Sequence, residues 1–77
     1  MRINKLDLHG TTLYEAESKV INFIEDNWDS NNDVEIITGN SYRMKNVVSK
    51  ILDLYKLSFR EGRLYDMNKG YIVVNFN

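Results

Sequence analysis

The chain has 77 residues, no cysteine and a formal net charge of −1. A chain of this length builds one small core, so we expect a single domain over residues 1–77. The absence of cysteine excludes disulfides and thiolate metal sites, and no apolar run reaches the roughly 20 residues of a membrane helix. We therefore expect a cytoplasmic, monomeric protein without membrane contact.

Acidic and basic residues are spread unevenly along the chain. Acidic residues gather in the first half, whereas most lysines and arginines follow residue 42. The near-neutral total differs from the strongly basic balance of many nucleic-acid-binding domains, but it leaves room for a local site. Any phosphate-binding surface is expected on the later half.

The first predicted elements are a strand and a helix. The pattern predicts a strand from Ile3 to His9, and Thr12 with Glu15 fits a capping box that satisfies exposed backbone N–H groups at a helix start. The following helix has one apolar stripe at three- and four-residue steps, which we expect in the core: Leu13, Ala16, Val20, Phe23, Ile24 and Trp28. The polar run 29–33 has turn chemistry.

The later elements follow the same logic. Val34–Ile37 predicts a short buried strand that runs into a turn at Thr38–Ser41. A second helix has the apolar positions Met44, Val47, Val48, Ile51, Leu52 and Tyr55. Residues 57–60 and 71–76 predict strands, and 61–70 is ambiguous. Asn68 and Gly70 are expected there as turn residues with permissive dihedrals.

The order β-α-β-α-β-β predicts an α/β fold. It is a two-layer sandwich, in which a four-stranded mixed sheet has two helices on one face. The two strand–helix–strand connections favour parallel strands, and the last two strands form an antiparallel hairpin. Leu6 and Leu8 would face the helices, so Asp7 and His9 would stand side by side on the other face.

Asp7 and the only histidine, His9, form a candidate acid–base pair. A carboxylate beside an imidazole favours its charged form and can hold one tautomer by a hydrogen bond. Such a group suits general acid–base catalysis near neutral pH. In the structural alternative, His9 caps a turn or helix end, and Asp7 bonds the backbone beyond the strand.

The turn at Thr38–Ser41 is the second candidate element. A loop that opens a helix points free N–H groups outward, and the helix dipole favours an anion there. The ends of two parallel strands would bring His9 and Gly39 close together. In the alternative, this is an ordinary turn with Ser41 as N-cap. Tyr42, Tyr65 and Tyr71 are candidates for base stacking, with Tyr71 the best placed.

Several of these motifs together resemble those of the Smr (small MutS-related) domain family. They are Leu6–Gly10, Thr12, Glu15–Ala16, Ile36–Gly39 and Asn68–Gly70 before a terminal apolar strand. The resemblance covers nearly the whole chain and implies a fold like the C-terminal domain of translation initiation factor three, with nuclease activity on DNA or RNA. Asp7 and His9 match the family's aspartate-x-histidine site. Ser41 stands where its glycine-x-glycine turn has the second glycine.

We expect cleavage of RNA, with DNA nicking as the nearest variant. DNA cleavage usually relies on divalent ions held by several carboxylates, whereas RNA has its own nucleophile in the 2′-hydroxyl. Asp7 is the only carboxylate of the motif, so we expect no metal site and no cofactor unless the substrate is DNA. The expected catalytic pair is Asp7 and His9, and the expected nucleic-acid contacts are Gly10, Thr38, Gly39, Asn40, Ser41, Arg43, Lys45 and Tyr71.

The competing function is a non-catalytic module that binds nucleic acid or a protein. The slightly acidic composition and Ser41 favour this module, whereas the intact Asp7–His9 pair favours the enzyme. Weak intrinsic binding is expected in either case, and a ribosome or protein partner that supplies affinity is compatible with both functions.

Overall fold

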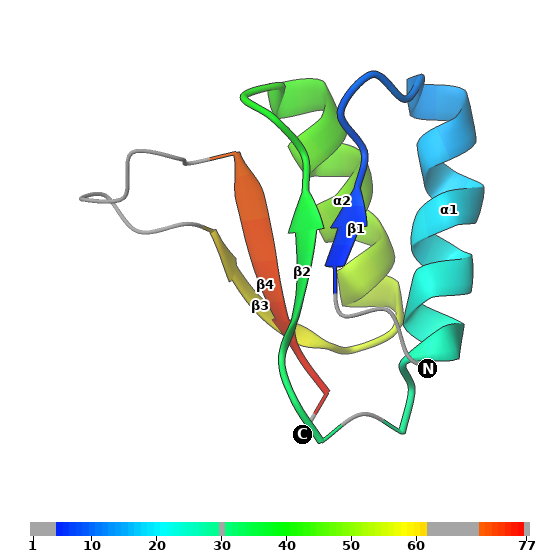
Figure 1. Ribbon diagram of the computed structural model, residues 1–77, viewed down its shortest axis with the longest axis vertical. Helices are drawn as coiled ribbons and strands as arrows, with labels where there is room; N and C mark the ends of the chain where they lie inside the picture. Colours follow the sequence, from blue (N-terminus) through cyan, green and yellow to red (C-terminus); the bar gives the residue numbers. More distant parts are fainter. Residues whose placement is uncertain (1–4, 30, 62–69, 77) are drawn as a thin grey trace.

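A computed structural model of the chain describes residues 5–29, 31–61 and 70–76. Its elements in chain order are β1 (Lys5–Asp7), α1 (Leu13–Asp26), β2 (Val34–Ile37), α2 (Tyr42–Leu54), β3 (Ser58–Glu61) and β4 (Tyr71–Asn75). This is the predicted order, and strand bounds differ from the predicted ones by one or two residues (Figure 1). The expected strand residues 3 and 4, the possible strand at 63–65, and Asn68 lie outside the described residues.

The four strands form one sheet in the order β1-β2-β4-β3. β1 and β2 are parallel neighbours, and β4 is antiparallel to both β2 and β3. The predicted parallel first pair and the predicted hairpin are therefore confirmed. The second connection differs from the expectation in one respect: β2 and β3 point the same way but do not pair, because β4 lies between them.

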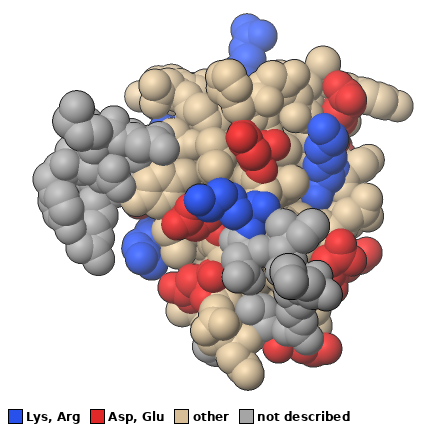
Figure 2. All heavy atoms as spheres, in the orientation of Figure 1, with Lys and Arg blue, Asp and Glu red and all other residues tan. Residues whose placement is uncertain are grey.

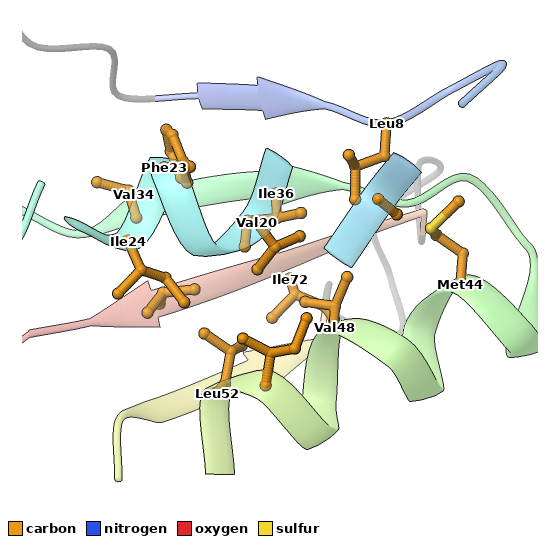
Figure 3. Close-up of a cluster of buried hydrophobic side chains, with 13 residues drawn as sticks. Leu8, Val20, Phe23, Ile24, Val34, Ile36, Met44, Val48, Leu52 and Ile72 are labelled. Atoms are coloured by element: carbon orange, nitrogen blue, oxygen red, sulfur yellow. The ribbon is translucent and has the colours of Figure 1, made fainter. Parts of the chain in front are cut away.

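The core lies between one face of the sheet and the two helices. Residues of the two central strands, β2 and β4, alternate, so every second one is buried against the helices, as Ile36 and Ile72 are. Figure 3 shows these side chains meeting those of α1 and α2. The buried apolar residues are Leu8, Ala16, Val20, Phe23, Ile24, Val34, Ile36, Met44, Val48, Ile51, Leu52, Ile72 and Val74. The two-layer α/β sandwich is thereby confirmed.

The apolar stripe of α1 is confirmed except at its two ends. Leu13 is 40% exposed and Trp28 is 50% exposed. Trp28 lies beyond the last helical residue, so helical spacing no longer decides which way it points; its ring meets those of Tyr55 and Phe76 edge-on. Leu13 is the first helical residue, and its side chain lies at the end of the core, where it stays partly exposed. Neither α1 nor α2, the helices of the described residues, is long and apolar enough to cross a membrane.

The predicted capping box at the start of α1 is confirmed. The Glu15 N–H donates to Thr12 Oγ1 at 3.2 Å, and the Thr12 hydroxyl donates to Glu15 Oε1 at 2.8 Å. These hydrogen bonds from Thr12 hold the pKa of the Glu15 carboxyl below its ordinary value of 4.5.

Ionised Glu15 therefore stabilises the fold at neutral pH. Because its folded pKa is lowered, this contribution is present above the unfolded pKa and is lost as the pH falls through the folded pKa. We expect Glu15→Gln to be less stable than the wild type at pH 7, and we expect the difference to shrink below pH 4.5. Urea unfolding of both proteins from neutral to acidic pH measures it. An unchanged difference over this range would contradict the assignment.

The end of α2 places a lysine in an unfavourable backbone conformation. Lys56 has φ +57°, and the N–H groups of Lys56 and Leu57 donate to Asp53 O and Leu52 O at 3.0 Å each. These are the two bonds of a Schellman motif, in which glycine is the preferred residue at the left-handed position.

We expect Lys56→Gly to stabilise the protein by about 0.5–1 kcal/mol, because glycine removes the steric cost of positive φ. Lys50→Gly is the matched control, since Lys50 lies inside α2 and its replacement should cost about 1 kcal/mol. Urea unfolding followed by Trp28 fluorescence compares the two variants. Destabilisation by both would refute the interpretation of Lys56.

Candidate functional site

Two loops leave the same end of the sheet side by side. β1 and β2 are parallel with Asp7 opposite Ile37, and the Leu8 N–H donates to Ile37 O at 2.8 Å beyond the strand. The loops that follow lead into α1 and α2, so both helices begin at this end (upper end in Figure 1). Between them lies a pocket of about 400 Å³, lined by Leu8, His9, Gly10, Thr11, Thr12, Leu13, Thr38, Gly39, Asn40, Ser41, Arg43 and Met44.

The first loop is a tight turn that presents His9. The Thr11 N–H donates to Leu8 O at 2.9 Å, and Gly10 has φ +79°, as the third residue of a type II turn requires. Leu8 is buried, whereas Asp7 and His9 are exposed. The predicted alternation along this strand is therefore confirmed, and His9 reaches the pocket from the turn.

The expected contact between Asp7 and the His9 imidazole is wrong. Asp7 Oδ1 instead accepts the backbone N–H of His9 at 2.9 Å. A short carboxylate reaches the N–H two residues ahead more easily than a ring on the next same-side residue, and it forms an Asx turn. The structural alternative for Asp7 is therefore what is observed. Among the described residues, the imidazole of His9 has no hydrogen-bond partner.

The second loop is held by the start of β4. Gly70 O accepts the N–H groups of Thr38 and Gly39 at 2.7 and 3.0 Å. Thr38 is buried, and its hydroxyl donates to Gly39 O at 2.9 Å. His9 Cδ2 lies 3.9 Å from the point where a Cβ on Gly39 would be, so the predicted approach of His9 and Gly39 is confirmed.

Gly70 makes a backbone contact that only glycine allows. A Cβ at Gly70 would lie 2.8 Å from both the Cα and the carbonyl carbon of Gly39. The absence of a side chain therefore lets β4 approach the loop closely enough for Gly70 O to bind it.

The start of α2 forms the third wall of the site. Ser41 is its N-cap, as one of the two interpretations expected: Ser41 Oγ accepts the Met44 N–H at 3.1 Å. Ser41 has φ −81°, which any residue adopts, and serine at this position therefore imposes no strain on the turn. Arg43 is the only lysine, arginine, aspartate or glutamate among the described residues that line the pocket. The helix dipole adds partial positive charge at this end.

The structure brings most of the predicted site residues together, but not all of them. The pocket is shared by His9, Gly10, Thr38, Gly39, Asn40, Ser41 and Arg43. Asp7 lies beside it under the His9 turn, Lys45 is half-buried on α2, and Tyr71 lies on the open face of the sheet. The sequence prediction missed the apolar lining from Leu13 and Met44. The sequence did contain a signal for Leu13, because this residue immediately follows the predicted cap Thr12.

The family model of the Smr domain matches residues 6–77. No curated protein is similar enough to the chain to count as a match. The matched span contains both loops and all the described residues that line the pocket. The chain therefore belongs to the Smr domain family, whose domains are nuclease-like or nucleic-acid-binding modules.

Proposed function

We propose that the protein is an endonuclease that cleaves RNA in the pocket between the two loops. The observation that carries this proposal is the shared position of His9 and Arg43, which line one pocket without an acidic residue among its described lining. Arg43 and the start of α2 suit a phosphate group, because a guanidinium and a helix N-terminus both favour an anion. His9 supplies an exposed imidazole, the side-chain group that most often acts as a general base.

The proposed reaction is a transesterification within the RNA strand. His9 takes the proton of a 2′-hydroxyl, and the 2′-oxygen bonds to the neighbouring phosphorus. The bond from phosphorus to the 5′-oxygen then breaks, and this oxygen takes a proton from solvent water. The products are a 2′,3′-cyclic phosphate and a 5′-hydroxyl, and His9 returns its proton to solvent. Arg43 neutralises the charge that grows on the phosphate oxygens.

The side chains around the pocket favour RNA over DNA as substrate. Among residues 5–29, 31–61 and 70–76, no three His, Cys, Asp or Glu side chains lie close enough to hold a metal ion together. DNA cleavage commonly uses ions held by such groups, whereas RNA supplies its own nucleophile. With Arg43 as the single cation of its described lining, the pocket should bind weakly by itself, so a ribosome or protein partner that adds affinity fits the same proposal.

The decisive experiment compares nucleic acids under matched conditions. The purified chain is incubated with end-labelled RNA and with supercoiled DNA of the same sequence, each with magnesium and with chelator. We expect RNA cleavage that persists in chelator and leaves 2′,3′-cyclic phosphate ends, which an acid-treatment mobility shift detects. Cleavage that depends strictly on magnesium, or that leaves 5′-phosphate ends, would contradict the proposed chemistry.

In this proposal Asp7 positions His9 through the backbone and does not touch the substrate. We expect Asp7→Asn to keep RNA cleavage within about threefold of the wild type, because the amide oxygen can still accept the His9 N–H. Asp7→Ala removes the acceptor and should cost about 0.5–1.5 kcal/mol of stability. Cleavage rates and urea unfolding of the two variants measure this. Loss of activity in Asp7→Asn with normal stability would show that the charge itself is needed.

The second candidate function is a non-catalytic nucleic-acid-binding module. The observation that favours it is the engagement of Asp7 by the backbone, which leaves the imidazole of His9 without a carboxylate partner among the described residues. This module would bind RNA through the same pocket. His9→Ala would then change the affinity for RNA, and neither the variant nor the wild type would cleave it. The two functions thus differ in whether the wild-type protein cuts RNA at all.

A further inference from the structure

Two tyrosines at the pocket end of the molecule are almost fully exposed. Tyr14 is 92% exposed and Tyr42 is 83% exposed, the highest values among the exposed large hydrophobic residues of the described chain. Both are neighbours in sequence of residues that line the pocket. Tyr14 comes after Leu13, and Tyr42 stands between Ser41 and Arg43. They occupy the second residue of α1 and the first residue of α2.

Both tyrosines lie in the first turn of a helix that begins at the pocket end, next to the lining residues and outside the lining itself. The Cα–Cβ bonds of a helix tilt toward its N-terminus, so side chains in the first turn lean past the end of the helix. Both helices begin at the end of the sheet that carries the pocket (Figure 1). Single exposed aromatic residues are ordinary on a protein surface. In this protein the first turn of each helix carries one exposed tyrosine, and the pocket lies between the starts of the two helices.

The described lining of the pocket combines apolar side chains with one cation. Leu8 and Met44 form a buried floor, and Leu13 keeps 40% of its surface exposed beside them. Arg43 is the one charged side chain among the described lining residues. The charged groups drawn in blue and red in Figure 2 are of both signs and interspersed. A ligand with flat apolar rings and an anionic backbone fits this set of groups.

We propose that the site selects unpaired RNA, with nucleobases stacked on Tyr14 and Tyr42 on either side of the phosphate bound at Arg43. Bases in a duplex already stack on each other and cannot lie on protein aromatic rings, whereas unpaired bases are free to do so. The stacking energy replaces the charge contacts that this near-neutral chain lacks. The inference rests on the proposed function in taking RNA as the ligand, but it does not require cleavage.

The test measures binding of single-stranded RNA and of a blunt RNA duplex of the same sequence by fluorescence anisotropy. Tyr14→Ala and Tyr42→Ala should each weaken single-strand binding by roughly 5- to 150-fold, the range expected for the loss of one stacked base. Tyr14→Phe and Tyr42→Phe keep the ring and should bind within about twofold of the wild type. Leu54→Ala is the matched control, because Leu54 is 81% exposed at the far end of α2.

Binding and cleavage are measured on the same proteins, so the two proposals can fail separately. Loss of single-strand affinity in the alanine variants alone, with weak duplex binding throughout, supports the inference even if no RNA is cut. Wild-type affinity in both alanine variants, equal loss for duplex and single strand, or no RNA binding by the wild type would overturn it. RNA cleavage together with wild-type single-strand affinity in both alanine variants would overturn the inference and leave the proposed function standing.

Discussion

Replacing His9 by alanine should lower the rate of RNA cleavage by about 10²- to 10⁴-fold, the range supplied by one general acid–base group. The side chain is exposed and lies in a turn held by the Thr11 N–H, which donates to Leu8 O, and by the Asp7 carboxylate, which accepts the His9 N–H. Its removal should therefore leave the free energy of unfolding within about 0.5 kcal/mol of the wild-type value. Single-turnover cleavage of a labelled RNA, together with urea unfolding, measures both quantities.

His9→Gln is the informative control for this variant. Glutamine retains a polar side chain that can donate and accept hydrogen bonds, but it does not titrate near neutral pH. We expect it to be as inactive as His9→Ala. Substantial cleavage by the glutamine variant would mean that His9 only binds or positions the RNA. An inactive wild type with RNA affinity that falls in His9→Ala would favour the non-catalytic module.

The sequence predicted the parts of this protein that depend on local patterns. The helices follow from apolar spacing and from the caps at Thr12 and Ser41, because capping is decided by a side chain and a backbone group three residues apart. The meeting of His9 and Gly39 followed from parallel strands, which end at the same edge of a sheet. Both predictions needed the element order and little else.

The features that the sequence did not predict depend on competition or on tertiary contact. The Asp7 carboxylate had two donors within reach along the chain, the His9 ring and the His9 N–H, and spacing alone does not rank them. Leu13 fits a helical stripe, but whether the stripe's first residue meets the core depends on where the neighbouring helix starts. The contact of Gly70 with Gly39 is set by strand pairing between segments far apart in the chain.

Gly70→Ala should have the largest effect on stability of any single methyl group added near the site. Its Cβ would lie 2.8 Å from two backbone atoms of Gly39, and backbone cannot rotate away as a side chain can. We expect a loss of about 3 kcal/mol or more, at or above the upper end of the range typical of overpacking. Separation of the two strands would also weaken the bonds from Thr38 and Gly39 to Gly70 O. Because Gly39 lies against His9, RNA cleavage should fall as well.

Gly10→Ala is the control for Gly70→Ala, because it replaces a glycine that makes no close backbone contact. Gly10 has φ +79°, but no atom lies within 4 Å of the point that a Cβ would occupy, so alanine there should cost only the roughly 1–2 kcal/mol of a left-handed backbone. Urea unfolding followed by Trp28 fluorescence reports on both variants from the opposite end of the fold. A Gly70→Ala protein as stable as Gly10→Ala would show that β4 can move away from the loop, and it would remove the structural reason for glycine at this position.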